Sequence, residues 1–266
     1  MALARELRLR IVSGIVMMAV ALAALWFGGV AFWALASLLA ILMMAEWATM
    51  AQAPRWQQLL AMAAVGALML SSLSFADPVK MATIASRLIA QTVDLTGLAA
   101  ILIAVVSFRA RLGGGVLYAV FPAVALIYIR EQPEQGFALS LWTLVVVWAT
   151  DIGAFFAGRA IGGPKIAPSI SPSKTWAGLA GGMVGALICG AAVASAFGLG
   201  TAFLIAGAPL AVAAQAGDFF ESWLKRRSGV KDSGTLLPGH GGVLDRLDGV
   251  VPVALLVAAG VAGGIL

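Results

Sequence analysis

The chain has 266 residues, of which 62% are hydrophobic and 11% are charged, and its mean hydropathy is +1.01. This charged fraction is about half that of a soluble domain, which excludes an ordinary soluble globular protein. We interpret the net charge of +5 as a sign of membrane orientation and expect no nucleic-acid partner. The single cysteine, Cys189, excludes an internal disulfide.

Apolar runs long enough to cross a bilayer recur along the whole chain, so the sequence predicts an all-α polytopic membrane protein. Arg5, Arg8 and Arg10 lead directly into the first run without a convincing cleavage site, which argues against a cleaved signal peptide. We expect about nine transmembrane helices, at residues 11–28, 30–49, 58–75, 94–108, 113–129, 137–158, 176–197, 200–217 and 249–266.

The fourth of these runs is short, and the basic residues decide whether it crosses the membrane. Only 14 continuous apolar residues, 95–108, are present there, fewer than the roughly 20 that a spanning helix needs. With nine spans and a cytoplasmic N-terminus, 14 of the 17 lysines and arginines lie inside, whereas without the fourth span only 5 do. The positive-inside rule therefore favours nine spans, with the fourth extended by the amphipathic stretch 82–93.

Two charge-rich loops, 159–175 and 218–248, then face the cytoplasm at the ends of the sixth to eighth spans. We accordingly divide the chain into two regions. Residues 1–135 form N-terminal helices with a lipid-facing or scaffolding role, which also offer a surface for dimerisation. Residues 136–266 form a C-terminal catalytic region that carries both loops.

The seventh span carries two overlapping patterns of small residues, Gly178 with Gly182 and Gly181 with Gly185. Such patterns let two helices approach closely, and ordinary helix packing is the leading interpretation. Glycine-rich spans are also compatible with a homodimer, so the oligomeric state stays open.

The first charged constellation starts at Asp151, inside or at the end of the sixth span, where an unpaired carboxylate is costly. Arg159 lies two helical turns away on nearly the same face, so a structural charge pair and a wet polar cavity are both open interpretations. Lys174 stands just before the next helix, for which Ser173 or Thr175 is the candidate N-cap. The N-terminus of that helix attracts phosphate.

The second constellation, residues 218–248, holds five of the twelve acidic residues of the chain. On a helix, Asp218, Glu221 and Lys225 share one face, and Asp245 and Asp248 are again three residues apart. Such carboxylate pairs can hold Mg²⁺, which prefers carboxylate oxygens, water and substrate phosphates. The sequence has no Cys/His cluster, which excludes a structural zinc site.

The same segment offers groups that bind phosphate. Lys225, Arg226 and Lys231 can meet phosphate oxygens, with arginine the better bidentate partner. Glycines on both sides of His240, the only histidine, allow backbone N–H groups to approach an anion closely. Neither a Walker loop nor a dinucleotide-binding fingerprint is present.

These runs, S-W-L-K-R, K-D-S-G and L-L-P-G-H-G-G-V-L-D-R-L-D, resemble the signature of the phosphatidate cytidylyltransferases (CDP-diacylglycerol synthases). Upstream, D-I-G-A-F-F-A-G-R and K-I-A-P-S-I-S-P-S-K-T-W look like a second region of that family, although Ile152 stands where many members carry a small polar residue. The resemblance covers residues 148–249. It implies a nucleotidyltransferase of phospholipid biosynthesis that converts CTP and phosphatidic acid into CDP-diacylglycerol and pyrophosphate.

The resemblance and the residue chemistry together give a predicted site. The catalytic residues are expected to be Asp218, Lys225, Arg226, Lys231, Asp245 and Asp248. Those facing Mg²⁺ are expected to be Asp218, Asp245 and Asp248, with Glu221 a weaker candidate. Substrate contacts are expected from Asp151, Arg159, Lys174, Ser222, Asp232, His240 and Arg246. A second, monovalent cation beside Mg²⁺ stays open.

The expected partners are CTP, phosphatidic acid and membrane lipid, at a bacterial-type inner membrane with the active site facing the cytoplasm. Membrane transferases acting on CDP-alcohols or polyprenyl groups are disfavoured, because Asp248-Gly249 is followed by Val-Val-Pro instead of their aspartate motifs. A transporter or channel is disfavoured because the charges cluster in loops and few lie mid-span. A non-enzymatic scaffold is the remaining alternative.

Overall fold

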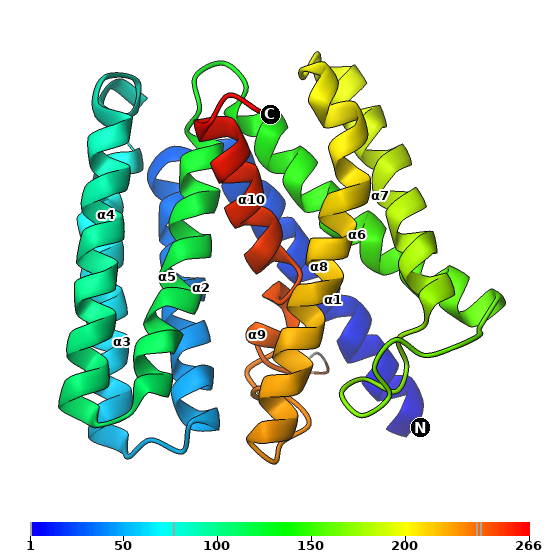
Figure 1. The fold of residues 1–266 in the computed structure, drawn as a ribbon, viewed down its shortest axis with the longest axis horizontal. Coiled ribbons are helices and arrows are strands. Elements are labelled where there is room, and N and C mark those ends of the chain that lie inside the picture. The colour runs from blue at the N-terminus through cyan, green and yellow to red at the C-terminus, as the bar shows by residue number, and fades with distance from the viewer. Residues whose placement is uncertain (1, 77, 238, 240) are drawn as a thin grey trace. The chain divides into compact units, whose positions relative to one another are not determined.

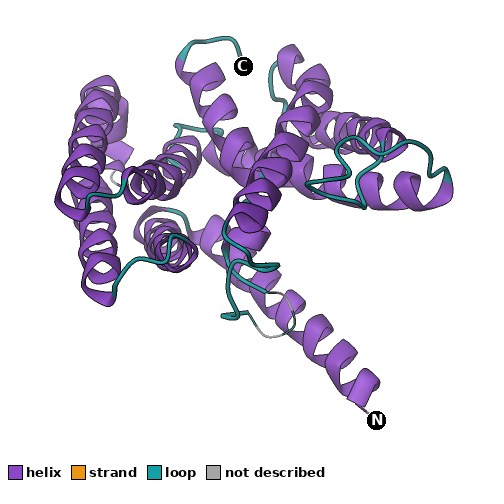
Figure 2. Cartoon of the chain, turned by 60° about the horizontal axis from the view of Figure 1, so that its bottom comes forward, coloured by secondary structure: helices purple, strands orange, loops and turns teal. Residues whose placement is uncertain are grey.

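The computed structural model describes residues 2–76, 78–237, 239 and 241–266, and it describes side chains for 12–76, 87–237, 239 and 241–266. Within this part of the chain the secondary structure consists of helices joined by loops, without strands (Figure 2). The predicted all-α polytopic class is confirmed.

The elements follow one another along the chain in the order that Figure 1 shows. They are α1 (Ala2–Phe27), α2 (Gly29–Met50), α3 (Arg55–Ser71), the 3₁₀ helix η1 (Ser72–Ala76), α4 (Pro78–Ser107), α5 (Ala110–Arg130), α6 (Gly136–Ala160), α7 (Trp176–Phe197), α8 (Thr201–Arg227), α9 (Leu244–Leu247) and α10 (Val250–Ala262). Among the described residues, seven helices are long and apolar enough to cross a membrane: α2, α3 with η1, α4, α5, α6, α7 and α8.

The doubtful fourth span is part of a long helix. Because α4 begins at Pro78, the helix extends through the amphipathic stretch as expected, and Arg87–Ser107 forms a candidate span of 21 residues. The last expected span, 249–266, is shorter than predicted. Its helix α10 has 13 residues, whereas a straight crossing needs roughly 20. The first expected span corresponds to the apolar part of α1, Val12–Phe27. The total of nine spans and the cytoplasmic N-terminus therefore stay predictions.

The chain forms two compact units. The first contains Met1–Pro133 and Ser228–Arg246, and the second contains Glu134–Arg227 and Leu247–Leu266. Residues 228–246 thus belong with the N-terminal helices, whereas the sequence interpretation assigned the whole 218–248 loop to the C-terminal region. The catalytic role given to that region stays a prediction.

In the first unit, α2 packs on α3 and α5, and α5 also packs on α4. The indole of Trp47 in α2 lies 5.0 Å from the ring of Tyr118 in α5, and its Nε1 donates to the backbone oxygen of Arg111 at 2.7 Å. A side chain at Gly115 would collide with this indole, so glycine lets the two helices approach there. These contacts fix the end of α2 that carries Glu46.

In the second unit, α7 packs against both α6 and α8, and α10 packs against α8. A side chain at Gly153 would collide with the backbone oxygen of Gly181, and one at Gly185 would crowd that of Ala149. Gly207 brings α8 equally close to α7. The packing interpretation of the glycine patterns is therefore confirmed. Since these glycines make contacts within one chain, they lend no support to a homodimer.

Candidate functional site

In the second unit, the loop between α6 and α7 is closed by backbone contacts that fix the position of Lys174. The amide of Ile166 donates to the backbone oxygen of Lys174 at 3.1 Å, and Lys165 and Thr175 form an isolated antiparallel bridge. Thr175 Oγ1 accepts a hydrogen bond from the amide of Gly178 at 3.0 Å. Of the two predicted N-caps of α7, Thr175 is therefore the observed one.

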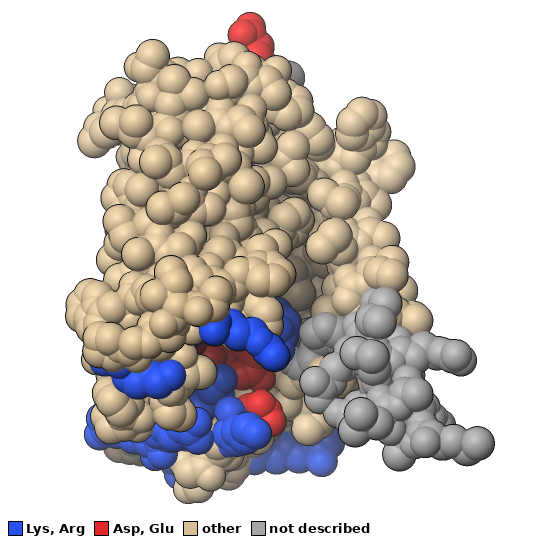
Figure 3. Space-filling view, turned by 90° about the vertical axis from the view of Figure 1, so that its right-hand side faces the viewer, with Lys and Arg blue, Asp and Glu red and all other residues tan. Residues whose placement is uncertain are grey.

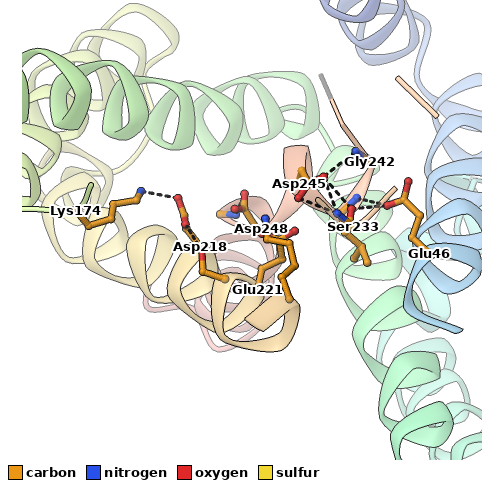
Figure 4. Close-up of polar contacts among 12 residues, drawn as sticks. Glu46, Lys174, Asp218, Glu221, Ser233, Gly242, Asp245 and Asp248 are labelled. Carbon is orange, nitrogen blue, oxygen red and sulfur yellow. Dashed lines mark hydrogen bonds and ion pairs between the residues drawn. The ribbon is translucent and has the colours of Figure 1, made fainter. Parts of the chain in front are cut away.

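Lys174 reaches across to an acidic residue of α8. Its Nζ lies 2.5 Å from Asp218 Oδ2 (Figure 4), and the two side chains are only 20% and 26% exposed. One turn further along α8, Ser222 Oγ donates to Asp218 Oδ1 at 3.3 Å. The structure thus brings together two predicted substrate-binding residues and one predicted metal-facing carboxylate.

Asp248 lies in the short connection between α9 and α10, and its backbone passes close to α8. A side chain at Gly217 would collide with the backbone oxygen of Asp248 and with the ring of Pro252. Glycine immediately before Asp218 therefore allows the chain at Asp248 to lie against α8. The carboxylate of Asp248 also accepts a hydrogen bond from the amide of Gly249 at 2.8 Å.

Negative charge accumulates around Asp248. Burial is the largest cause that raises the pKa of its carboxyl from 3.8 to about 7, followed by the negative charge of Asp218. Asp151 adds a smaller effect in the same direction, while the Gly249 amide and the positive charge of Lys174 partly offset it. Three predicted site carboxylates of the second unit therefore share one electrostatic environment, which favours the arrival of a cation.

Glu221 and Lys225 form an ion pair one helical turn apart, with 2.7 Å between Lys225 Nζ and Glu221 Oε2. This confirms that the two side chains share a face of α8. Only 2% of the Glu221 side chain and 14% of the Lys225 side chain are exposed. A buried carboxylate that already holds a lysine fits a structural role better than the metal-binding role predicted for Glu221.

Most of the remaining residues of the predicted site have side chains at the surface. The exposed side chains are Arg159 and Arg226 in the second unit, and Lys231, Asp232 and Arg246 in the first. Figure 3 shows basic and acidic side chains gathered at one end of the face that it presents, while the rest of that face is nearly free of charge. His240 lies outside the described residues. The roles of these side chains stay predictions.

In the first unit, Asp245 closes the loop that precedes it. Its Oδ2 accepts hydrogen bonds from the amide of Gly242 at 2.7 Å and from the amide of Ser233 at 3.0 Å (Figure 4). The hydroxyl of Ser233 also lies 3.0 Å from the same oxygen. Because these donors occupy Asp245 Oδ2, the geometry favours a loop-shaping role over the predicted contact with Mg²⁺.

Glu46 is a further acidic residue that sequence reasoning missed. It lies near the end of α2, is 4% exposed, and accepts hydrogen bonds from Ser233, Val243 and Leu244. The available signal was an acidic residue inside the apolar run 30–49, since an ionisable group within a span is costly without partners.

The structure also limits how a metal could be held. Among the described residues, no group of three or more His, Cys, Asp and Glu side chains is arranged to hold a metal ion. Mg²⁺ commonly binds to one or two carboxylates and completes its shell with water and substrate phosphates. Asp218 and Asp248 fit that mode, because they are hard oxygen donors whose negative charges act on each other.

Comparison with known proteins identifies the relatives of this chain. A model described as "Cytidylyltransferase family" matches residues 8–262. A protein of Brucella suis named phosphatidate cytidylyltransferase is 48% identical over 147 residues, which cover 54% of each chain. Proteins of the same name from Pseudomonas aeruginosa and Bacillus subtilis are 42% identical over 159 residues (56% of this chain, 58% of the relative) and 44% over 135 (46% of each). The matched region spans about half the length of these curated relatives.

Proposed function

This chain belongs to the cytidylyltransferase family, and from that membership we propose that it is a membrane enzyme making CDP-diacylglycerol and pyrophosphate from CTP and phosphatidic acid. The relatives that share 42 to 48% of their aligned residues with it carry the name of this activity. The observation that carries the proposal is the cluster of Asp218, Asp248 and Lys174, in which a lysine and interacting carboxylates meet in one unit.

The chemistry requires little from the protein beyond charge control and alignment. An oxygen of the lipid phosphate, already anionic at neutral pH, attacks the α-phosphorus of CTP and forms a new P–O bond. The bond from that phosphorus to the oxygen bridging to the β-phosphate breaks, and pyrophosphate leaves with the electron pair. No Ser–His or Cys–His dyad is needed, because the nucleophile carries no proton to remove.

The barrier comes from bringing two polyanions together, so fixed positive groups lower it. Lys174 is positioned for this task, since a closed loop and Asp218 fix its ammonium group. We assign the exposed cations Arg226 and Lys231 to the phosphates of CTP or of the lipid. Ser222 orients Asp218 through its hydroxyl.

We further propose that Asp218 and Asp248 hold Mg²⁺. The support is the placement of two carboxylates in one unit, where burial and then the negative charge of Asp218 raise the pKa of Asp248, so that a cation bound between them would favour the ionised form. When bound, the ion would neutralise phosphate charge and help to orient the reacting groups. Glu221 is left out of this ligand set because its side chain is only 2% exposed, whereas that of Asp218 is 26% exposed beside its partner Lys174. Asp245 is left out because three donors of its own loop converge on one oxygen.

The protein is an integral membrane protein by its apolar helices, and we propose that its site faces the cytoplasm of a bacterial-type inner membrane. Support for this orientation comes from the basic residues, most of which lie in the loops that the positive-inside rule assigns to the cytoplasm. This side of the membrane is where CTP is available.

The test uses purified protein in lipid nanodiscs with CTP, phosphatidic acid and Mg²⁺, and the product is identified by mass spectrometry. We expect CDP-diacylglycerol with CTP and phosphatidic acid, and none when diacylglycerol replaces phosphatidic acid, because that lipid lacks the attacking phosphate. A folded preparation that forms no CDP-lipid under these conditions contradicts the proposal.

A further inference from the structure

We propose that Glu46 is a positioning residue, whose buried carboxylate fixes the shape of the segment 228–246 and so places the substrate-contacting side chains of that segment. The inference rests on the proposed cytidylyltransferase activity for its consequence, but on contacts within the first unit for its geometry. Glu46 lies in α2 (Gly29–Met50), far from the segment in sequence, with Val243 197 residues away.

The carboxylate joins both ends of a loop. Glu46 Oε1 accepts a hydrogen bond from the amide of Val243 at 2.8 Å. Its Oε2 accepts one from the amide of Leu244 at 2.9 Å and lies 2.9 Å from the hydroxyl of Ser233 (Figure 4). Since Ser233 stands ten residues before Val243, one side chain of α2 holds the start and the end of the intervening loop.

The segment is also shaped around this carboxylate. A Cβ at Gly234 would lie 2.6 Å from Glu46 Oε1, and one at Gly242 would lie 2.5 Å from Glu46 Oε2. A side chain at either position would force the carboxylate to move, so glycine at both positions leaves the space that the carboxylate fills. Burial of Glu46 at 4% exposure is then compensated by its donors, as a buried charge requires.

Ser233 links Glu46 to the second carboxylate of the loop, Asp245. Its hydroxyl carries one hydrogen and lies within hydrogen-bonding distance of both carboxylates, so it donates to one of them at a time. The amide of Ser233 donates to Asp245 as well. This network sets the backbone from which Lys231 and Arg246 project.

Glutamine at position 46 cannot reproduce these bonds. Its side chain has one acceptor oxygen and one NH₂ donor in place of two acceptor oxygens. If the NH₂ group faces Val243, that amide loses its acceptor, and if it faces Leu244, the other amide does. Aspartate keeps both oxygens on a side chain one methylene shorter. We therefore expect Glu46→Asp to retain part of what Glu46→Gln loses.

The control is a carboxylate of the same kind at another place in the first unit. Glu131 is 7% exposed, and its Oε1 accepts a hydrogen bond from the amide of Gly29 at 2.7 Å. Glu131→Gln thus removes the charge of a buried carboxylate at a different connection, while its amide oxygen can still accept the bond from Gly29. It reports the general effect of such a loss on the unit.

The experiment combines hydrogen–deuterium exchange of peptides covering residues 233–246 with steady-state kinetics of CDP-lipid formation. In Glu46→Gln we expect amide exchange at Val243 and Leu244 to accelerate roughly tenfold or more, because one of the two N–H groups loses its partner. We expect kcat at saturating substrates to fall by roughly 100-fold, as for other misplaced reacting groups, with partial recovery in Glu46→Asp. Glu131→Gln should change neither quantity comparably.

Each outcome decides a separate point. Unchanged exchange at residues 233–246 in Glu46→Gln overturns the inference, and so does faster exchange with kcat equal to that of Glu131→Gln. If the folded natural protein forms no CDP-lipid, the proposed function fails, and exchange alone decides whether Glu46 holds the segment.

If Glu46→Gln does not fold, Ser233→Ala replaces it. That variant removes only the hydroxyl link, and it should accelerate exchange and lower kcat less strongly, while no change in either overturns the inference.

Discussion

Replacing Asp248 with asparagine should make the metal-free protein more stable while abolishing its activity. A tenfold change in an equilibrium corresponds to about 1.4 kcal/mol, so a pKa of about 7 in place of 3.8 means that ionisation of folded Asp248 is disfavoured by about 4 kcal/mol. The proton on Asp248 stabilises the folded protein relative to the unfolded one. This stabilisation is complete below pH 3.8 and is lost as the pH rises through about 7, where folded Asp248 ionises. At about pH 8 the natural protein bears the whole penalty, which neutral asparagine avoids.

The assay is thermal unfolding in EDTA, followed by tryptophan fluorescence, at about pH 5 and about pH 8. We expect Asp248→Asn to unfold at a higher temperature than the natural protein at about pH 8, by an amount equivalent to at most about 4 kcal/mol, and we expect the gap to narrow at about pH 5. Turnover should be lost, because the side chain no longer offers a charged oxygen to Mg²⁺.

The matched control is Asp94→Asn, which makes the same chemical change at an exposed carboxylate of α4. It should show neither the pH-dependent stabilisation nor the loss of turnover. Two results refute the reasoning: an Asp248→Asn protein that is less stable than the natural one in EDTA at about pH 8, or one that keeps its turnover.

Three further predictions follow from the second unit. Lys174→Met should lower kcat/KM by roughly 100-fold through loss of a fixed cation, measured by CDP-lipid formation, whereas Lys165→Met, at an exposed lysine of the same loop, should change it little. As the pH rises towards about 7, the Mg²⁺ concentration that half-saturates binding, measured by titration calorimetry, should fall about tenfold per pH unit because Asp248 must ionise to bind, and binding to Asp248→Asn should lack this dependence. Gly217→Ala should lower the free energy of unfolding by about 1–3 kcal/mol because its methyl group collides with neighbouring backbone, while Gly200→Ala, which has open space, should unfold nearly as the natural protein does.

The features that could be predicted from the sequence are those that depend on local pattern. Hydropathy and basic residues located the helices, and the extension of the short fourth span into α4 followed from its amphipathic flank. Spacing also predicted the pair of Glu221 and Lys225, since residues four apart share a helix face. The cap at Thr175 was one of two predicted from residue type.

The features that the sequence could not supply depend on contacts between distant segments. Glu46 and Val243 are 197 residues apart, and no spacing rule links a carboxylate in α2 to two amides at the start of α9. Asp245 shows the same limit. Its distance of three residues from Asp248 suggested a pair of metal ligands, but backbone donors from Ser233 and Gly242 occupy it, and these become visible only in the folded loop.

The central claim is that the protein transfers the cytidylyl group of CTP to a lipid phosphate, and the fate of the individual CTP phosphates tests it most directly. The purified protein is given phosphatidic acid, Mg²⁺ and CTP labelled at either the α- or the γ-phosphate. We expect the α-label to enter the lipid fraction and the γ-label to appear as pyrophosphate, in equal amounts. A γ-label that enters the lipid or appears as inorganic phosphate, or an α-label that stays in water-soluble nucleotide, contradicts this claim.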